Sequence, residues 1–420
     1  MEYGLIGEHL PHSFSKEIHG RCADYDYRLT ELAPDEIDGF LKAKKFKAIN
    51  VTIPYKQTVI PYLDEIDASA QEIGAVNTIV HRDGKLYGYN TDFYGMVFLI
   101  RRIGISLSGK KVLILGTGGT CRTARAVAKD AKAAQIITVG RSAGADVSYE
   151  EAYAIHADAE VMINTTPCGM YPYADGTAER AGTPLDLSRF PRLCGVVDAV
   201  YNPLRTNLVL DAKERGIPSE GGLSMLVAQA VKACRIFLGR DFEGMEDEAD
   251  RIYRQIAAEK ENIVLTGMPG SGKTTVGKAL AEALGRPFVD TDQGIVQRAG
   301  KPISQIFDEM GEAGFRDLET QAVRDAANQS TGCIIATGGG AILREENLRA
   351  LRRTGRIYFL DRALEALLPT DDRPLASTAE AIRKRYAERY ERYCSTCDRR
   401  VEIDESVEHT VEFIRKDFLL

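Results

Sequence analysis

The chain lacks the features of several protein classes. No apolar run approaches the ~20 residues that a transmembrane helix needs, so we expect no membrane partner. The N-terminal stretch, Met1-Glu2-Tyr3-Gly4-Leu5, has neither the basic nor the apolar region of a signal peptide. Its eight cysteines show no disulfide-like framework, which suits a reducing compartment. These absences together predict a cytoplasmic protein.

The chain also lacks a positive charge balance, internal repeats and low-complexity tracts. Its formal net charge is -7, which disfavours nucleic acid as a partner. An anionic substrate would therefore be held by local arginines and lysines. Cys394 and Cys397 form a C-x-x-C pair with no second pair to complete a zinc site, and we interpret them as structural. The 420 residues suit about two or three domains.

What the chain does contain is two different phosphate-binding loops. Each follows an apolar run that predicts a buried strand, and each leads into a helix whose N–H groups and dipole favour an anion. The first loop, after residues 111–115, is Gly116-Thr117-Gly118-Gly119-Thr120-Cys121. The second, after residues 262–266, is Gly267-Met268-Pro269-Gly270-Ser271-Gly272-Lys273-Thr274, followed by Thr275. A redox cofactor and a nucleoside triphosphate in one chain indicate two catalytic modules.

The first loop is typical of a Rossmann dinucleotide site in which Gly116, Gly118 and Gly119 face the pyrophosphate. Such sites usually carry an acidic residue about 20 positions later, on the ribose 2′-OH. Here the next strand ends in Gly140-Arg141-Ser142. Arg141 favours a 2′-phosphate, and hence NADP(H) over NAD, although it could instead be a solvated surface arginine. Cys121, at a helix N-terminus, could be a reactive thiolate or an inert small residue.

Hydrophobic periodicity predicts an α/β protein throughout. Residues 1–100 alternate strands (near 3–6, 48–52 and 78–81) with helices (34–44 and 68–73). Strands are expected near 111–115, 135–139, 160–164 and 195–199, with helices between them. Residues 223–258 are predicted to be helical and to lead into the second loop's strand through a short linker. Residues 261–420 form a further array of strands and helices.

Motifs around the first loop make a family resemblance specific. In chain order they are His12-Ser13-Phe14-Ser15, Asn50-Val51-Thr52-Ile53-Pro54-Tyr55-Lys56, Gly74-Ala75-Val76-Asn77-Thr78, Gly88-Tyr89-Asn90-Thr91-Asp92, Asn164-Thr165-Thr166-Pro167-Cys168-Gly169-Met170, Tyr201-Asn202-Pro203 and Met225-Leu226-Val227-Ala228-Gln229. Together they resemble shikimate dehydrogenase over residues 1 to about 255. The family's usual Asn-Arg-Thr at the cofactor turn is replaced here by Gly140-Arg141-Ser142.

This resemblance implies a catalytic pair. Reduction of a ketone requires a donor near the oxygen that gains charge as hydride arrives. Lys56 would be that donor, and Asp92 would orient its ammonium while binding the substrate. Tyr201 would lie near the nicotinamide. The substrate's carboxylate and hydroxyls would be held by Ser13, Ser15, Thr52, Asn77 and Gln229.

The second loop by itself indicates an NTPase or kinase whose Lys273 and Thr274 engage the phosphates and Mg²⁺. The next strand ends in Asp290-Thr291-Asp292, and a later one runs into Gly338-Gly339-Gly340, whose N–H groups are exposed to a small ligand. With the Gly311–Arg316 segment, Glu319, Arg373-Pro374-Leu375 and the helix bearing Arg389, this set resembles shikimate kinase over residues 261–420.

The resemblance implies the following roles. ATP would lie on Gly267, Gly270, Ser271, Gly272, Lys273, Thr274 and Thr275. Thr274 and Asp290 would hold Mg²⁺, and Asp292 would bond the acceptor hydroxyl, as a base in one reading. Arg373 would swing in on a lid. Shikimate would be held by Arg316, Gly338, Gly339, Gly340 and Arg389, since arginine binds a carboxylate through both oxygens. The family's arginine seven residues before Arg373 is Ala366 here.

Together the two resemblances imply a bifunctional enzyme that reduces 3-dehydroshikimate with NADPH and phosphorylates the shikimate with ATP. We expect an α/β substrate lobe over 1–100, completed by helices over 223–258, an NADP-binding Rossmann domain over 101–222, and a P-loop domain of the nucleoside-monophosphate-kinase kind over 261–420. Three alternatives stay open: a quinate/shikimate dehydrogenase using NAD, a non-catalytic ligand-binding regulator, and a kinase for another polyol or a nucleotide. The oligomeric state is left open.

Overall fold

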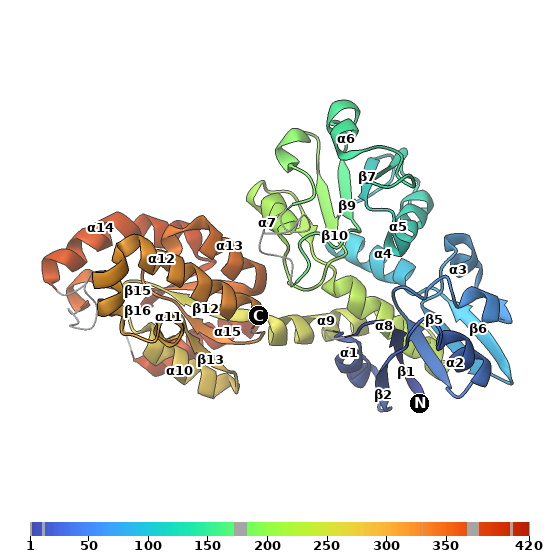
Figure 1. Cartoon of the computed structure of the whole chain (residues 1–420), viewed down its shortest axis with the longest axis horizontal. Helices are drawn as coiled ribbons and strands as arrows, with labels where there is room; N and C mark the ends of the chain where they lie inside the picture. The colour runs from blue at the N-terminus through green and yellow to red at the C-terminus, as the bar shows by residue number, and fades with distance from the viewer. Residues whose placement is uncertain are drawn as a thin grey trace. The chain divides into compact units, whose positions relative to one another are not determined.

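The computed structural model describes residues 2–10, 13–171, 183–329, 331–367, 378–403 and 406–419. The chain divides into two compact units, whose elements are labelled in Figure 1. The first comprises Met1–Asn202 and Thr206–Ile256, and the second Pro203–Arg205 and Ala257–Leu420. Within the described ranges, no helix combines the length and apolar character needed to cross a membrane.

The N-terminal part of the first unit is built on a six-stranded mixed sheet with the order β2-β1-β3-β5-β6-β4. Strands β1 to β3 are parallel, whereas β5 is antiparallel to both β3 and β6. The strands are β1 (Tyr3–Gly7), β2 (Tyr27–Glu31), β3 (Ala48–Val51), β4 (Glu65–Ile66), β5 (Thr78–Arg82) and β6 (Lys85–Tyr89). The three strands predicted from apolar runs are confirmed to within one residue. The short or half-exposed β2, β4 and β6 were not predicted.

The register of this sheet brings three chain segments to one edge. Asn50 of β3 lies opposite Thr78 of β5, which lies opposite Tyr89 of β6. Because β5 runs against its neighbours, its start meets the ends of β3 and β6. The residues that follow β3, precede β5 and follow β6 therefore lie side by side.

Helices cover both faces of this sheet. They are α1 (Ser15–Cys22), α2 (Ile37–Ala43), α3 (Ala68–Ile73) and α8 (Leu223–Leu238). The core on one face includes Ile37 and Leu41 of α2 with Ala70 of α3, and the core on the other includes Ala233 and Phe237 of α8. The helix predicted over 68–73 is confirmed, and the one predicted over 34–44 is confirmed as the shorter α2.

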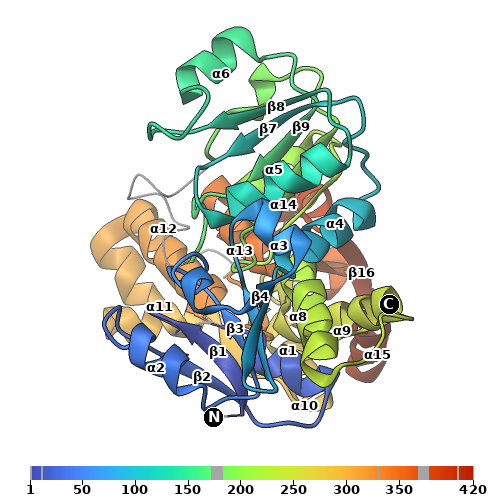
Figure 2. The ribbon, with the colours of Figure 1, turned by 90° about the vertical axis from the view of Figure 1, so that its right-hand side faces the viewer.

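The second sheet of this unit is parallel, with the order β11-β10-β9-β7-β8. Its strands are β7 (Lys111–Leu115), β8 (Gln135–Val139), β9 (Val161–Asn164), β10 (Gly195–Asp198) and β11 (Ser219–Glu220). Four of them were predicted. The neighbouring helices are α4 (Asp92–Arg102), α5 (Gly119–Asp130), α6 (Tyr149–Ile155) and α7 (Asn207–Glu214). Figure 2 shows α5 on one side of β7, β8 and β9, and α6 on the other, as in a doubly wound fold.

Helix α9 (Met245–Lys260) follows α8, so the helical prediction for 223–258 is confirmed as two helices. Its polar face is tied to the rest of the first unit by ion pairs. Glu248 pairs with Arg235 of α8 at 2.6 Å, and Asp250 pairs with Arg102 of α4. Since α9 ends at Lys260 and the next strand begins at Asn262, the connection is helical rather than a flexible tether.

The second unit contains a parallel five-stranded sheet with the order β13-β14-β12-β15-β16. Its strands are β12 (Asn262–Thr266), β13 (Phe288–Asp290), β14 (Ile334–Ala336), β15 (Gly355–Arg362) and β16 (Arg399–Ile403). Its helices are α10 (Lys273–Leu284), α11 (Thr291–Ala299), α12 (Ile303–Gln329), α13 (Glu345–Thr354), α14 (Ala379–Thr396) and α15 (Val407–Leu419). One core packs α10 and α15 on the sheet, and another packs α12, α13 and α14 (Figure 1).

Candidate active sites

Lys56 and Asp92 form an ion pair at the sheet edge where β3, β5 and β6 meet. Lys56 lies in the segment after β3, and Asp92 is the first residue of α4, soon after β6. Lys56 Nζ donates to Asp92 Oδ2 at 2.6 Å, and the two side chains are 19% and 11% exposed. The pair is therefore partly shielded from water, which strengthens its electrostatic interaction, but solvent still reaches it.

Asn77 and Gln229 belong to the same cluster. Asn77 Nδ2 donates to Asp92 Oδ1 at 2.9 Å, and its Oδ1 accepts from the backbone N–H of Thr91 at 2.8 Å. The Thr91 hydroxyl donates to Gln229 Oε1, at 3.3 Å, which brings α8 into the network. Four residues predicted from separate motifs, Lys56, Asn77, Asp92 and Gln229, thus come together.

The other predicted substrate ligands lie on loops and an element start in the same unit. Ser15 is the buried first residue of α1, and its N–H donates to Ser13 Oγ at 3.3 Å. Thr52 directly follows β3, and the carbonyl of Ile6 in β1 accepts from its N–H at 3.0 Å. The Tyr201 ring lies 5.4 Å from that of Phe14, between centroids, so Tyr201 reaches the Ser13–Ser15 segment. Burial raises the pKa of Tyr201.

The first glycine loop connects β7 to α5. Gly116 has φ +102°, and a Cβ there would lie 2.9 Å from Thr166 Cγ2, so both backbone shape and close packing require glycine. At Gly118 and Gly119 a Cβ would meet no atom within 4 Å. The backbone at the start of α5 is therefore unobstructed at these two glycines, which suits the close approach of an anion.

Arg141 is exposed just beyond the end of β8, next to this loop. The adjacent Ser142 Oγ lies 2.9 Å from Thr117 Oγ1, which ties the segment after β8 to the glycine loop. Gly140 packs on the same threonine, since its Cβ would lie 3.2 Å from Thr117 Cγ2. No carboxylate thus occupies the place where an NAD site has its acidic residue.

Of the two interpretations of Cys121, a reactive thiolate and an inert small residue, the structure favours the inert residue. The side chain is 3% exposed and packs in the core between α5 and its neighbours. Burial raises the pKa of this thiol, and the nearby Arg125 and Arg122 only partly oppose that effect. The residue acts as a small apolar group at the helix start, because desolvation outweighs the dipole.

The second glycine loop connects β12 to α10, with positive φ at Gly267, Gly270 and Gly272. Lys273 is buried, and its Nζ donates to the carbonyl oxygens of Gly267 and Met268 at 2.9 and 3.0 Å. The ammonium therefore lies over the loop whose N–H groups would surround phosphates. Ser271 is also buried, and Thr274 and Thr275 follow in the first turn of α10.

Oxygen ligands from two elements meet beside this loop. Thr274 Oγ1 donates to Asp290 Oδ2 at 3.0 Å. Asp290 Oδ1 also caps α11 by accepting from the N–H groups of Asp292 and Gln293. A hydroxyl and one carboxylate suit Mg²⁺, which usually binds through few protein oxygens plus phosphates and water. Among the residues described, no group of three or more metal-binding side chains occurs.

Asp292 lies beside the triple-glycine loop after β14. A Cβ at Gly338 would lie 2.6 Å from Asp292 Oδ1 and 2.8 Å from Glu319 Oε1, so only glycine fits between the two carboxylates. Glu319 is buried, and this burial raises its pKa, an effect that the adjacent Arg316 opposes. The sequence had suggested no individual role for Glu319.

Arg316 of α12 and Arg389 of α14 both contact this triple-glycine loop. Arg316 Nη1 donates to Glu319 Oε2 at 2.6 Å, and its guanidinium packs directly against Gly340. Arg389 Nη1 donates to the Gly339 carbonyl at 3.2 Å, and both arginines are 7% exposed. The loop, two buried cations and Asp292 therefore form one cluster. Arg373 and the lid segment lie outside the described residues.

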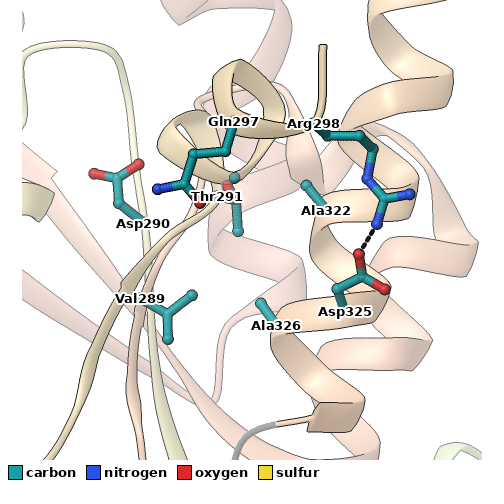
Figure 3. A pocket seen from close by; sticks show the side chains of 9 residues that line it. Val289, Asp290, Thr291, Gln297, Arg298, Ala322, Asp325 and Ala326 are labelled. Atoms are coloured by element: carbon teal, nitrogen blue, oxygen red, sulfur yellow. Dashed lines mark hydrogen bonds and ion pairs between the residues drawn. The ribbon is translucent and has the colours of Figure 1, made fainter. Parts of the chain in front are cut away.

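A groove opens beside β13, between α11 and α12 (Figure 3). Arg298 of α11 pairs there with Asp325 of α12, and Asp290 lies at one end. Of the described residues that the sequence predicted for this site, only Asp290 lines the groove. The groove is therefore beside the predicted acceptor cluster rather than part of it.

The site residues that sequence reasoning missed are buried polar side chains behind the catalytic cluster. They are Tyr27, Asn50, Thr78 and Thr91. Three of them stand inside the quoted motifs, but a motif does not show which side chain each one bonds. Tyr27 lies in a strand that was not predicted, and nothing in its surroundings in the sequence marks it.

These folds and clusters define a dinucleotide-dependent oxidoreductase joined to a P-loop phosphotransferase. Comparisons with known proteins specify both. Residues 5–79 match the family model "Shikimate dehydrogenase substrate binding domain", and residues 269–417 match the model "Shikimate kinase". A "Shikimate dehydrogenase (NADP(+))" of Clostridium perfringens (strain 13 / Type A) is 38% identical over 273 residues, covering 60% of this chain and 97% of the relative.

Two solved structures resemble the first unit. A chorismate mutase/shikimate 5-dehydrogenase fusion protein from Clostridium acetobutylicum gives a TM-score of 0.56 at 32% identity, covering 60% of this chain and 96% of the other. Shikimate 5-dehydrogenase from Thermus thermophilus, in complex with NADP(H) and shikimate, gives 0.51 at 28%, covering 60% and 99%. The chain belongs to the shikimate dehydrogenase family and carries a shikimate kinase domain as a fusion. It is an oxidoreductase and a kinase of the shikimate pathway.

Proposed function

We propose that the first unit reduces 3-dehydroshikimate to shikimate with NADPH, and that the second phosphorylates shikimate to shikimate 3-phosphate with ATP and Mg²⁺. The Lys56–Asp92 pair, joined to Asn77 and Gln229, carries the first proposal. We further propose three domains: the substrate lobe over 1–100 with the helices over 223–258, the Rossmann domain over 101–222, and the kinase over 261–420.

Lys56 stabilises the negative charge that develops on the ketone oxygen and can supply its proton. Asp92 accepts a hydrogen bond from Lys56 at 2.6 Å and thereby fixes the direction of the ammonium. The second carboxylate oxygen is held by Asn77, so the carboxylate is fixed from both sides. Such a preorganised arrangement is worth most where water is partly excluded, as it is here.

The remaining polar groups hold the substrate. Gln229 and Asn77 bind the hydroxyls next to the catalytic pair, and Thr52 is near them at the sheet edge. Ser13 and Ser15 bind the carboxylate, since hydroxyls and the start of α1 favour an anion. Tyr201, close to Phe14, lies toward the nicotinamide.

NADPH supplies the hydride, and the glycine loop fits its pyrophosphate because the space over Gly118 and Gly119 is open. Arg141 binds the 2′-phosphate. The relatives named as NADP(+) enzymes support this choice of cofactor. The rival reading, a quinate/shikimate dehydrogenase that uses NAD, is disfavoured by Gly140 at the place of the acidic residue.

In the second unit, Lys273 neutralises the β- and γ-phosphates while the loop N–H groups hold them. Thr274 and Asp290 hold Mg²⁺, Asp290 through water. Asp292 orients the acceptor hydroxyl and can accept its proton. The close approach of Asp292 Oδ1 to Gly338 of the triple-glycine loop supports this role.

Arg316 and Arg389 bind the shikimate carboxylate, with Gly338, Gly339 and Gly340 supplying N–H groups. Both guanidinium groups are buried against the glycine loop, so their charge is little screened by water. Arg373 neutralises the transferred phosphoryl group. A kinase whose acceptor carries no carboxylate would not need two buried arginines at this loop.

The proposal is tested by two separate assays on the purified chain. NADPH oxidation should depend on 3-dehydroshikimate, and quinate should not reduce NAD⁺ at a comparable rate. Formation of ADP should depend on shikimate and on Mg²⁺. Failure of either substrate to support turnover in a folded protein would refute the corresponding half of the proposal.

A further inference from the structure

A chain of hydrogen bonds runs behind the catalytic pair of the first unit. The Tyr27 hydroxyl donates to Asn50 Oδ1 at 2.7 Å, and Asn50 Nδ2 donates to Thr78 Oγ1 at 3.1 Å. The Thr78 hydroxyl donates to Asn77 Oδ1 at 3.0 Å, and Asn77 Nδ2 donates to Asp92 Oδ1 at 2.9 Å. The chain crosses strands β2, β3 and β5 and ends at the carboxylate that holds Lys56.

All the bonds in this chain point the same way. The tyrosine hydroxyl donates to the Asn50 oxygen, so the Asn50 nitrogen faces Thr78. The Thr78 oxygen accepts that bond, so its hydrogen turns to Asn77. Hydrogen bonds aligned in one direction polarise and strengthen one another, and here the last donor meets a negative charge. The alignment therefore favours one fixed direction of the Asp92 carboxylate oxygens.

Except at its Asp92 end, this network is shielded from solvent. Tyr27, Asn50, Asn77 and Thr78 are at most 5% exposed, and Asp92 is 8% exposed. The Asn77 amide cannot turn over, because its oxygen would then face the Asp92 carboxylate and its nitrogen the N–H of Thr91. Loss of the Thr78 hydroxyl would remove one of the two acceptors of Asn50 Nδ2, which also donates to the Asn77 carbonyl. It would also remove one of the donors to Asn77 Oδ1, which otherwise accepts only from Thr91. Each lost bond lies where water is poorly placed to replace it.

We infer that Thr78, Asn50 and Tyr27 are positioning residues of the dehydrogenase. They orient the Asn77 amide, which in turn orients Asp92 and Lys56. They touch neither the reacting atoms nor the dinucleotide loop, which belongs to the other sheet. This inference rests on the proposed function and extends it to a second layer of residues.

Thr78→Val tests the central link, because valine keeps the branched shape in a fully buried strand position and removes only the hydroxyl. The single-turnover rate of NADPH oxidation with 3-dehydroshikimate should fall about tenfold, the effect of one lost buried hydrogen bond. The Michaelis constant for NADPH should not change. Thr78→Ser restores the hydroxyl and should restore the rate.

Tyr27→Phe tests the far end, and Tyr55→Phe is its matched control. Both tyrosines are 2% exposed, and each hydroxyl donates one bond, Tyr27 to Asn50 and Tyr55 to the Leu32 carbonyl at 2.5 Å. Tyr55 belongs to a different apolar cluster. Tyr27→Phe should slow NADPH oxidation, by less than Thr78→Val does, whereas Tyr55→Phe should leave the rate near the wild-type value.

Thermal unfolding and the shikimate kinase rate of each variant show whether the chain is folded. A wild-type rate in Thr78→Val would overturn the inference. So would a loss that Thr78→Ser does not restore, or one that Tyr55→Phe reproduces, because either would mark a general packing defect. If the wild-type chain itself fails to oxidise NADPH with 3-dehydroshikimate, the proposed function fails first, and the two failures are thereby distinguished.

Discussion

At the scale of single residues, the dehydrogenase site depends on charges held at fixed distances. Asp92 links Lys56 at 2.6 Å to Asn77 at 2.9 Å. Asp92→Asn keeps the size of the side chain but removes its charge. The new amide nitrogen would face either Lys56 Nζ or Asn77 Nδ2, and both of these groups are donors. The rate of ketone reduction should fall by roughly 10²–10⁴. Steady-state kinetics of NADPH oxidation measure this, and an unchanged kcat would remove Asp92 from the mechanism.

Arg141 is the residue that would decide between NADPH and NADH. It is exposed beyond the end of β8. Its contribution to NADPH binding would come from a charge-assisted hydrogen bond to the 2′-phosphate. Arg141→Ala should raise the Michaelis constant for NADPH about ten- to a hundredfold, the equivalent of roughly 1.5–3 kcal/mol. The constant for NADH should hardly move, and Arg141→Lys should keep part of the NADPH preference. Equal effects on both cofactors would contradict the assignment.

The sequence could predict which charged residues belong to the sites, but not which buried side chains form hydrogen bonds that orient them. Lys56, Asp92, Asp290 and Lys273 stand in motifs whose chemistry is readable from residue type and spacing. The partners of a buried Asn50 or Tyr27 depend on strand register, which residues far apart in the sequence determine together. The hydrogen-bond partners of Asn50 and Tyr27 can be identified only once the pairing of the strands is known.

At the scale of elements, the start of α5 shows burial prevailing over the helix dipole. Burial raises the pKa of Cys121, so its thiolate is scarcer at neutral pH than that of an ordinary thiol. Iodoacetamide at neutral pH should therefore label Cys121 much more slowly than the exposed Cys194, and NADPH should not be needed to protect it. Mass spectrometry of the labelled peptides measures both rates. Faster labelling of Cys121 would contradict the buried-thiol description.

The triple-glycine loop after β14 is a second element whose function depends on close approach. A Cβ at Gly340 would overlap the Arg316 guanidinium and push it from Glu319. Gly340→Ala should raise the Michaelis constant for shikimate by about tenfold or more, the cost of a lost charge-assisted bond, with little change for ATP.

Gly294→Ala is the control for this substitution. Gly294 lies in α11 of the same domain, and its Cβ would meet only the Ala322 Cβ, at 3.7 Å. Alanine there should be tolerated, since it favours the helix. If Gly340→Ala binds shikimate as well as Gly294→Ala does, the assigned contact of Arg316 with the acceptor is wrong.

Element prediction succeeded for several strands whose apolar runs are continuous and buried, although the equally buried β15, GRIYFLDR, was not predicted. The buried strands β7, β9 and β12 were each located to within a residue, because parallel strands covered on both faces are apolar throughout. Strands β2 and β16 were missed because their outer faces are exposed and their sequences mostly polar, YRLTE and RRVEI. Their pairing with neighbours, rather than their own composition, makes them strands.

At the scale of the whole molecule, each catalytic cluster is built within its own unit. The two activities should therefore be separable. Lys56→Ala should abolish ketone reduction and leave shikimate phosphorylation intact, and Lys273→Ala should do the opposite. A mixture of the two variants should convert 3-dehydroshikimate to shikimate 3-phosphate through free shikimate, after a lag. If each substitution silenced both activities in folded protein, the units would have to share a site.

The central claim is that one chain carries two consecutive reactions of one metabolite. It is tested most directly by supplying wild-type protein with 3-dehydroshikimate, NADPH, ATP and Mg²⁺ and measuring NADPH oxidation together with shikimate 3-phosphate. The account predicts that both proceed and that, at completion, each NADPH oxidised is matched by one shikimate 3-phosphate formed. NADPH oxidation without any phosphorylated product, or no oxidation at all, would contradict it.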